Sequence, residues 1–363
     1  MRIVAVAVAV AVRPWRRIRR MNSRQGARDA GALVAPPKSA STLAPMCDND
    51  SFDDMVAYRL RSEFLSRRGF GSLSLGAGLA SLLPIGCKSA DPVPGPVPAA
   101  TATASGAVIA PTANAVATTE SEVSITTPDG AGDAYFVRPA TGTAPAVLIW
   151  PDIFGLRPAF RQMGKRLAES GYAVLVVNPF YRTKKAPTSS PHADFEDPAT
   201  RDALTRLAHS LTPETEVTDA KALTAWLDQQ PSVDRSRKMG TTGYCMGGPL
   251  VMRTAATNPD RIGAAATFHG GGLVTDKPDS PHLLIPKMKA HFLIAIAAND
   301  DAKQPDAKGT LRAAFAQASL PATIEVYEGT MHGWCPPDSH VYDRDAAEKA
   351  WGELLMLFKS ALG

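Results

Sequence analysis

Short apolar runs alternate with amphipathic segments through the last two thirds of the chain. The runs have the length and composition of buried strands, and the segments between them repeat their apolar residues at helical spacing. The predicted strands are residues 122–127, 132–138, 146–150, 173–177, 238–242, 262–268, 291–298 and 322–327, and the predicted helices are 158–169, 214–230, 249–256, 307–316 and 343–362. A polar excursion without a predicted element precedes the second helix. This alternation is typical of an α/β domain with a mostly parallel sheet and helices on both faces.

The hexapeptide Gly-Tyr-Cys-Met-Gly-Gly at residues 243–248 stands between a predicted strand and a predicted helix. Glycines on both sides of Cys245 permit the tight turn of a nucleophile elbow, which holds a side chain up at the carboxyl edge of a sheet. The N–H groups and partial positive charge at the start of the next helix favour a thiolate and can hold a developing oxyanion. The pattern therefore predicts a catalytic cysteine. The alternative is a buried structural cysteine in a glycine-rich turn.

Two further groups complete the chain order nucleophile, acid, histidine that triads have on such sheets. Asp300 and Asp301 follow the strand at 291–298, and His332 lies between glycine-flanked turns after the last predicted strand. An acid held against one imidazole nitrogen fixes the tautomer, so that the other nitrogen can take the thiol proton. Adjacent residues point to different sides of the chain, so only one aspartate is expected to meet His332. His269 is expected either to line the pocket or to be a hydrogen-bonded structural histidine.

From about residue 122 to the C-terminus, the chain resembles the dienelactone hydrolase family, cysteine hydrolases that open enol-lactones. The most specific pieces of the resemblance are the elbow at 243–248, Thr-Met-His-Gly-Trp at 330–334, and Trp-Pro-Asp-Ile-Phe-Gly-Leu at 150–156. The resemblance implies the α/β-hydrolase fold. It also implies a small-molecule ester or lactone as the substrate, and no cofactor.

The resemblance also implies roles for individual residues. It places a Cys-Asp-His triad on Cys245, Asp300 and His332. It places an oxyanion hole on the backbone N–H groups of Met246 and Ile153.

Two positions depart from the pattern of the family. The Glu-Ile-Phe-Gly motif of the family has a glutamate that holds the resting thiol, whereas this chain has Asp152, which is one methylene shorter. Arg182 lies near the position of one of the arginines that bind the substrate carboxylate, and Gly-Trp-Cys-Pro-Pro at 333–337 lacks the second. The resemblance thus places thiol gating on Asp152 and substrate binding on Arg182, and activity on dienelactone itself does not follow.

Length and composition agree with one folded domain in the last part of the chain. The sequence has 363 residues and a formal net charge of +4. It divides into an over-long N-terminus or signal n-region at 1–65, a signal region at 66–90, a Pro/Ala/Thr-rich linker at 91–120 and a hydrolase domain at 121–363. The domain carries no basic stripe with interleaved aromatic residues, so no nucleic-acid partner is expected. No apolar run reaches the roughly 20 residues of an ordinary membrane span.

The signal region has the features of twin-arginine export. Arg67 and Arg68 precede a mildly apolar, glycine-containing stretch and then the linker. The protein is therefore expected in the periplasm, with a lipid on Cys87 as its conceivable link to a membrane. The alternative is a chance arginine pair in a cytoplasmic protein. An export signal works poorly behind a long extension, so Met46 or Met55 is the expected start.

The chemistry that these residues predict is acyl transfer to a thiolate. Cys245 attacks an ester or lactone carbonyl, two N–H groups hold the oxyanion, and His332 protonates the leaving alkoxide before it activates water. No histidine or carboxylate cluster has ligand spacing, so no metal is expected. Two other functions stay open: an acyl transferase or thioesterase on the same triad, and an exported binding protein without turnover. Cys335 is expected to be structural, with a disulfide to Cys245 as the alternative.

Overall fold

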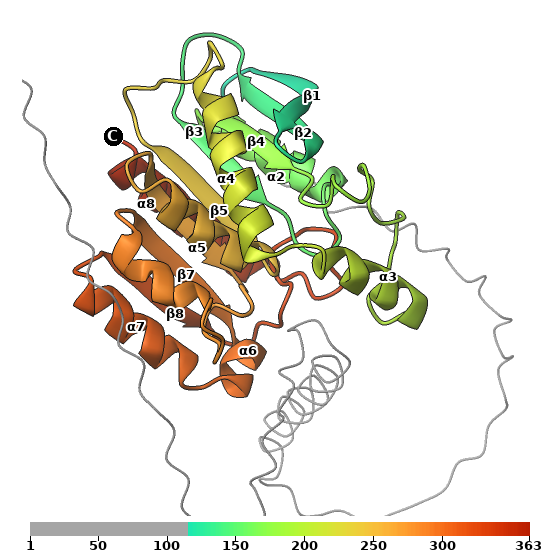
Figure 1. Ribbon diagram of the computed structural model, residues 1–363, viewed down its shortest axis with the longest axis vertical. Coiled ribbons are helices and arrows are strands. Elements are labelled where there is room, and N and C mark those ends of the chain that lie inside the picture. The colour runs from blue at the N-terminus through green and yellow to red at the C-terminus, as the bar shows by residue number, and fades with distance from the viewer. Residues whose placement is uncertain (1–114) are drawn as a thin grey trace, which may run out of the picture. The chain divides into compact units, whose positions relative to one another are not determined.

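A computed structural model describes residues 115–363 of the chain. The predicted arginine pair, Cys87 and nearly all of the linker lie outside the described residues. An eight-stranded sheet runs through the domain in the order β1-β2-β4-β3-β5-β6-β7-β8 (Figure 1). Its first edge is antiparallel, because β1 (Thr118–Thr127) pairs with β2 (Gly130–Pro139), which in turn pairs with β4 (Ala173–Val177).

The rest of the sheet is parallel, as predicted. These strands are β3 (Ala146–Trp150), β5 (Met239–Tyr244), β6 (Ile262–Phe268), β7 (His291–Ala297) and β8 (Ala322–Tyr327), each parallel to its neighbours, and β3 is also parallel to β4. Parallel strands end at the same edge of a sheet, so the segments that follow them meet there.

Helices cover both faces of the sheet. One face packs against α2 (Pro158–Glu169) and α8 (Arg344–Ala361). The other packs against α4 (Pro213–Asp228), α5 (Gly247–Thr257) and α7 (Ala307–Gln317), of which α4 and α5 lie on the near side in Figure 1.

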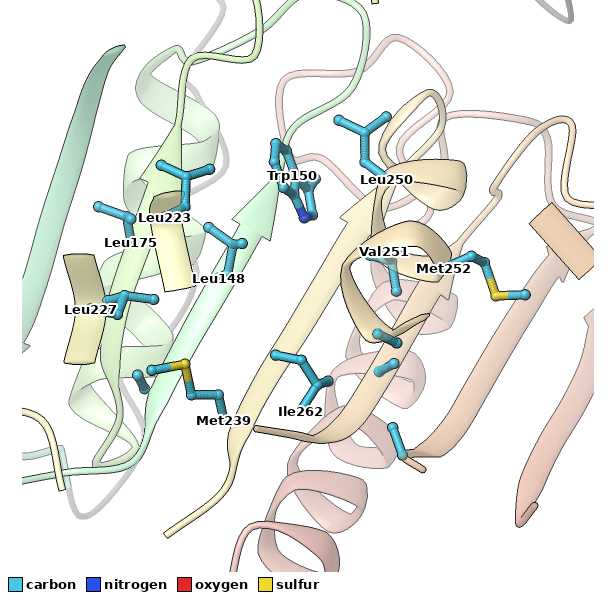
Figure 2. Packing of buried hydrophobic residues seen from close by; sticks show 14 of the residues in the cluster. Leu148, Trp150, Leu175, Leu223, Leu227, Met239, Leu250, Val251, Met252 and Ile262 are labelled. Carbon is cyan, nitrogen blue, oxygen red and sulfur yellow. The ribbon is translucent and has the colours of Figure 1, made fainter. Parts of the chain in front are cut away.

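The buried strands divide their side chains between these two layers. In β3, Val147 and Ile149 belong to the cluster with α2 and α8, whereas Leu148 and Trp150 belong to the cluster with α4 and α5. Figure 2 shows Leu148 and Trp150 on the side of the sheet where Leu223 of α4 lies. Strands buried on both faces are apolar throughout, which is why the sequence shows them as continuous apolar runs.

Three short elements were not predicted from the sequence. They are α3 (Pro198–Ala208) in the polar excursion, the 3-10 helix η1 (Pro281–Lys287), and α6 (Ala298–Lys303) directly after β7. In α3 only Leu204 and Leu207 are buried, so its apolar periodicity is weak. None of the helices between residues 115 and 363 combines the length and apolar character that a membrane crossing requires.

Candidate active site

Cys245 occupies a strained turn between β5 and α5. Its φ of 53° lies in the left-handed region, which a residue with a side chain adopts only when the surrounding structure enforces it. The Cys245 N–H donates to the Phe268 carbonyl at 3.1 Å. A Cβ on Gly243 would collide with the Gly247 carbonyl, and one on Gly247 would lie 2.5 Å from the Trp150 carbonyl oxygen. The two glycines therefore allow the close approach of backbones that the predicted elbow needs.

The helix behind the elbow is tied to the neighbouring strand β3. The indole Nε1 of Trp150 donates to Thr254 Oγ1 of α5 at 3.1 Å, and both side chains are buried. The Thr254 hydroxyl in turn donates to the Leu250 carbonyl at 2.7 Å. This bond fixes the position of α5, whose first turn follows Cys245 directly.

His332 meets one of the two adjacent aspartates. Its Nδ1 lies 2.8 Å from Asp300 Oδ2, and its backbone N–H donates to Asn299 Oδ1 at 2.8 Å. Asp301 instead accepts a 2.5 Å hydrogen bond from Lys308 Nζ. All three acceptor side chains belong to α6, so one short helix positions both the ring and the backbone of His332. The role of Asn299 was missed from the sequence, where only the neighbouring aspartates carried a signal.

The surroundings of His332 favour its protonated form. Burial lowers its pKa, but the negative charge of Asp300 and the sulfur of Cys245 outweigh burial and raise that pKa well above the ordinary value. Hydrogen bonding to Asp300 and to Cys245 acts in the same direction. An imidazolium held between a carboxylate and a sulfur stabilises a thiolate.

His269 is fully buried beside the triad histidine. Its ring centroid lies 5.2 Å from that of His332 in an edge-to-face arrangement. Burial and the charge of His332 hold the His269 pKa well below its ordinary value, so the ring is neutral. Its backbone N–H donates to Ala295 O at 2.8 Å, but neither ring nitrogen has a hydrogen-bond partner among residues 115–363. The ring therefore packs against His332 and is not the hydrogen-bonded structural histidine of the sequence-based alternative.

Asp152 is bound by an arginine that sequence reasoning missed. Arg157 donates to both carboxylate oxygens of Asp152, at 2.6 and 2.9 Å, and to both oxygens of Asp338, at 2.7 and 2.9 Å. Asp152 Oδ1 also accepts the Phe154 N–H at 3.0 Å. Arg157 thus joins the loop that carries Ile153 to the segment that follows His332. No local sequence pattern indicates this contact, which depends on how two loops meet.

Arg182 lies in a separate network at the hairpin edge of the sheet. Its guanidinium binds both oxygens of the buried Asp219, at 2.8 and 2.7 Å, and Asp129 Oδ2 at 2.7 and 3.0 Å. Tyr181 donates to the same Asp219 at 2.8 Å. Because Asp219 belongs to α4 and Asp129 to the β1–β2 turn, Arg182 connects these two elements. Arg182 follows β4, which β3 separates from the strand that carries Cys245.

The two predicted oxyanion donors share an apolar neighbourhood. Ile153, Phe180 and two leucines of α3, Leu204 and Leu207, form one buried apolar cluster. Met246 packs against this cluster. Cys335 is buried in the separate cluster that includes α8, and it forms no disulfide with Cys245. Burial raises the Cys335 pKa well above its ordinary value, which keeps the thiol protonated and unreactive.

Comparison with known proteins identifies the family. The profile of the dienelactone hydrolase family matches residues 133–362. The chain belongs to the dienelactone hydrolase family. An Escherichia coli K12 protein provisionally named carboxymethylenebutenolidase is 28% identical over 232 residues, which cover 62% of this chain and 81% of the relative. The carboxymethylenebutenolidase of Rhodococcus opacus is 26% identical over 195 residues, which cover 53% of this chain and 71% of the relative.

Solved structures show the same fold. A Klebsiella pneumoniae protein provisionally named dienelactone hydrolase superposes with a TM-score of 0.59 at 23% identity, covering 67% of this chain and 99% of that protein. The predicted α/β-hydrolase fold is therefore confirmed, with a mixed, mostly parallel sheet and flanking helices. The chain is a hydrolase similar to carboxymethylenebutenolidases, to which it is distantly related.

Proposed function

We propose that this member of the dienelactone hydrolase family cleaves carboxylic esters or lactones through a thioacyl-enzyme on Cys245. His332 is the general base, and Asp300 orients it. The observation that supports this most is the 2.8 Å contact between Asp300 Oδ2 and His332 Nδ1. It assigns Nδ1 to the carboxylate, so that Nε2 is the nitrogen that exchanges a proton with the sulfur.

The reaction has two steps on the same groups. In the first, the Cys245 sulfur adds to the carbonyl carbon, the N–H groups of Met246 and Ile153 hold the oxyanion, and protonated His332 gives its proton to the leaving alkoxide. In the second, neutral His332 takes a proton from water, whose oxygen adds to the thioester carbonyl carbon. The C–S bond then breaks, the carboxylic acid leaves, and the Cys245 thiolate is restored beside protonated His332. Esters and lactones suit a thiolate because an alkoxide leaves more readily than an amide nitrogen.

Two relatives support a lactone or ester substrate by what they are named to cleave. The Rhodococcus opacus relative is a carboxymethylenebutenolidase, and a Bradyrhizobium relative, 26% identical over 234 residues, carries the provisional name of a 2-oxo-3-(5-oxofuran-2-ylidene)propanoate lactonase. For this chain we propose cleavage of a carboxylic ester or lactone bond, and we name neither of these lactones as its substrate.

Turnover by matched cysteine variants tests the proposal. The wild-type protein should hydrolyse 4-nitrophenyl esters and a simple enol-lactone, and Cys245→Ala should reduce the rate to the uncatalysed level. Cys335→Ala is the control, because Cys335 is buried in the cluster with α8 and has no part in the proposed reaction. Full activity of Cys245→Ala, or an equal loss in both variants, would contradict the assignment of the nucleophile.

A further inference from the structure

We infer that the site takes substrates with a neutral, apolar acyl group and discriminates against acyl groups that carry a carboxylate. The inference rests on the proposed function, because it concerns the acyl group that Cys245 would receive. Three observations carry it: the side chains around the oxyanion donors, the partners of the nearby arginines, and the charges at the edge of the apolar cluster.

An acyl group bound at the oxyanion hole would meet apolar side chains. The carbonyl oxygen must lie within hydrogen-bond distance of the Ile153 and Met246 N–H groups, so the atoms attached to that carbonyl lie beside the same residues. Ile153 and Met246 belong to one apolar cluster with Phe180, Leu204 and Leu207. Half-buried Phe154 and Phe195 pack against this cluster, with their rings 6.3 Å apart and edge to face. A carboxylate desolvated against these side chains would lack a partner.

The arginines of the neighbouring loops are already bound to protein groups. Arg182 binds both oxygens of Asp219 and one of Asp129. Arg157 binds both oxygens of Asp152 and of Asp338. Each guanidinium pairs with one buried carboxylate, Asp219 or Asp152, and with one half-exposed carboxylate, Asp129 or Asp338. A substrate carboxylate would therefore have to replace an existing ion pair to reach either arginine. These arginines therefore serve the protein and not the substrate.

Two acidic side chains flank one ring of the apolar cluster. Asp194 and Glu196 flank Phe195 and are exposed, and Phe195 lies against Phe154 of the oxyanion loop. Arg201 donates to the Phe195 carbonyl at 3.4 Å, and its charge acts on Asp197. Negative charges beside the apolar cluster disfavour an anionic acyl group there. Arg201 is the cation beside Phe195 that a substrate carboxylate would have to use.

A matched pair of esters tests the inference on the full-length protein. The acyl groups of 4-nitrophenyl 5-methylhexanoate and mono-4-nitrophenyl glutarate have the same number of non-hydrogen atoms, but one ends in an isopropyl group and the other in a carboxylate. With the Cys245→Ala rate subtracted, we expect kcat/KM for the neutral ester to be at least about 30-fold higher, because the unpaired carboxylate loses its hydration. Equal values, or a preference for the glutarate ester, would overturn the inference and leave the proposed function standing. Turnover of neither ester would overturn both.

Two variants test whether the apolar side chains set the preference between the esters or whether a nearby cation binds the substrate carboxylate. Phe195→Lys adds a positive charge at the edge of the cluster and should raise the relative kcat/KM of the glutarate ester by roughly tenfold. Arg201→Met should leave the ratio of the two esters unchanged within about twofold, the range expected for a charge that the substrate does not use. A selective loss of glutarate turnover in Arg201→Met would identify Arg201 as a carboxylate receiver and contradict the inference.

Discussion

The contacts of single residues distinguish candidate catalytic groups that the sequence alone does not separate. Asp300 and Asp301 are adjacent aspartates, but Asp300 contacts the ring of His332 and Asp301 contacts Lys308. We expect Asp300→Asn to lower kcat/KM by roughly 10³-fold, because the amide no longer holds the correct tautomer or stabilises the imidazolium. Asp301→Asn is the matched control and should change kcat/KM less than about threefold. Steady-state kinetics on one aryl ester measures both, and the reverse order of losses would overturn the assignment.

Two roles are open to Asp152: it either holds the resting thiol of Cys245 or shapes the loop that carries Ile153. If it held the resting thiol, Asp152→Asn would speed the alkylation of Cys245 in the absence of substrate. The bidentate contact with Arg157 and the bond to the Phe154 N–H favour a role in shaping the loop that carries Ile153. We therefore expect Asp152→Asn to lower kcat while the alkylation rate of Cys245 stays unchanged. Iodoacetamide labelling followed over pH by peptide mass spectrometry measures this rate, and faster labelling of the variant would restore thiol gating.

The same labelling experiment reports the charge of His332. Its raised pKa keeps the ring protonated as the pH rises through the ordinary histidine value of about 6.5, and this positive charge favours the thiolate. Asp300→Asn removes the carboxylate that raises the pKa, so the ring should lose its proton at lower pH. Labelling of Cys245 at pH 7 to 8 should then be slower than in the wild type. An unchanged pH profile would mean that Asp300 does not control the charge of His332.

At the scale of elements, Arg157 links the loop after β3 to the segment between β8 and α8. Asp152 is buried and the Arg157 side chain is 12% exposed, whereas the Asp338 side chain is 43% exposed. Arg157→Ala should therefore lower the free energy of unfolding by about 3 kcal/mol, since it leaves Asp152 buried without its partner. Asp338→Asn should cost less than about 1 kcal/mol. Urea denaturation of both variants tests the difference, and equal losses would show that the Asp338 contact matters as much as the buried one.

The long elements were predictable from the sequence because their patterns are local. Strands β3, β4, β6 and β8 match the predicted strands residue by residue, and α2 begins and ends as predicted. The short elements were not, because α6 has only six residues and α3 buries two leucines. What the sequence could not supply are partners that loops bring together from distant positions, such as Asp338 for Arg157 and Asp219 for Arg182.

At the scale of the whole molecule, we propose that the signal region exports the folded hydrolase. Replacement of both Arg67 and Arg68 by lysine should leave precursor in the cytoplasm of the native host, because the twin-arginine receptor reads the guanidinium pair and not the charge. The same replacement at Arg59 and Arg61, which follow either expected start and precede the predicted signal region, is the control. Fractionation and immunoblotting measure the outcome. A periplasmic fraction unchanged by the first double substitution would rule out this route.

The central claim is that an acyl group passes through the sulfur of Cys245, and trapping that intermediate tests it most directly. The protein is mixed with excess 4-nitrophenyl butyrate, quenched in acid during turnover, and digested for peptide mass spectrometry. We predict a burst of nitrophenolate and a butyryl group on Cys245 that hydroxylamine removes, with neither in Cys245→Ala. Turnover without a label on Cys245, or a burst that persists in Cys245→Ala, would contradict the account.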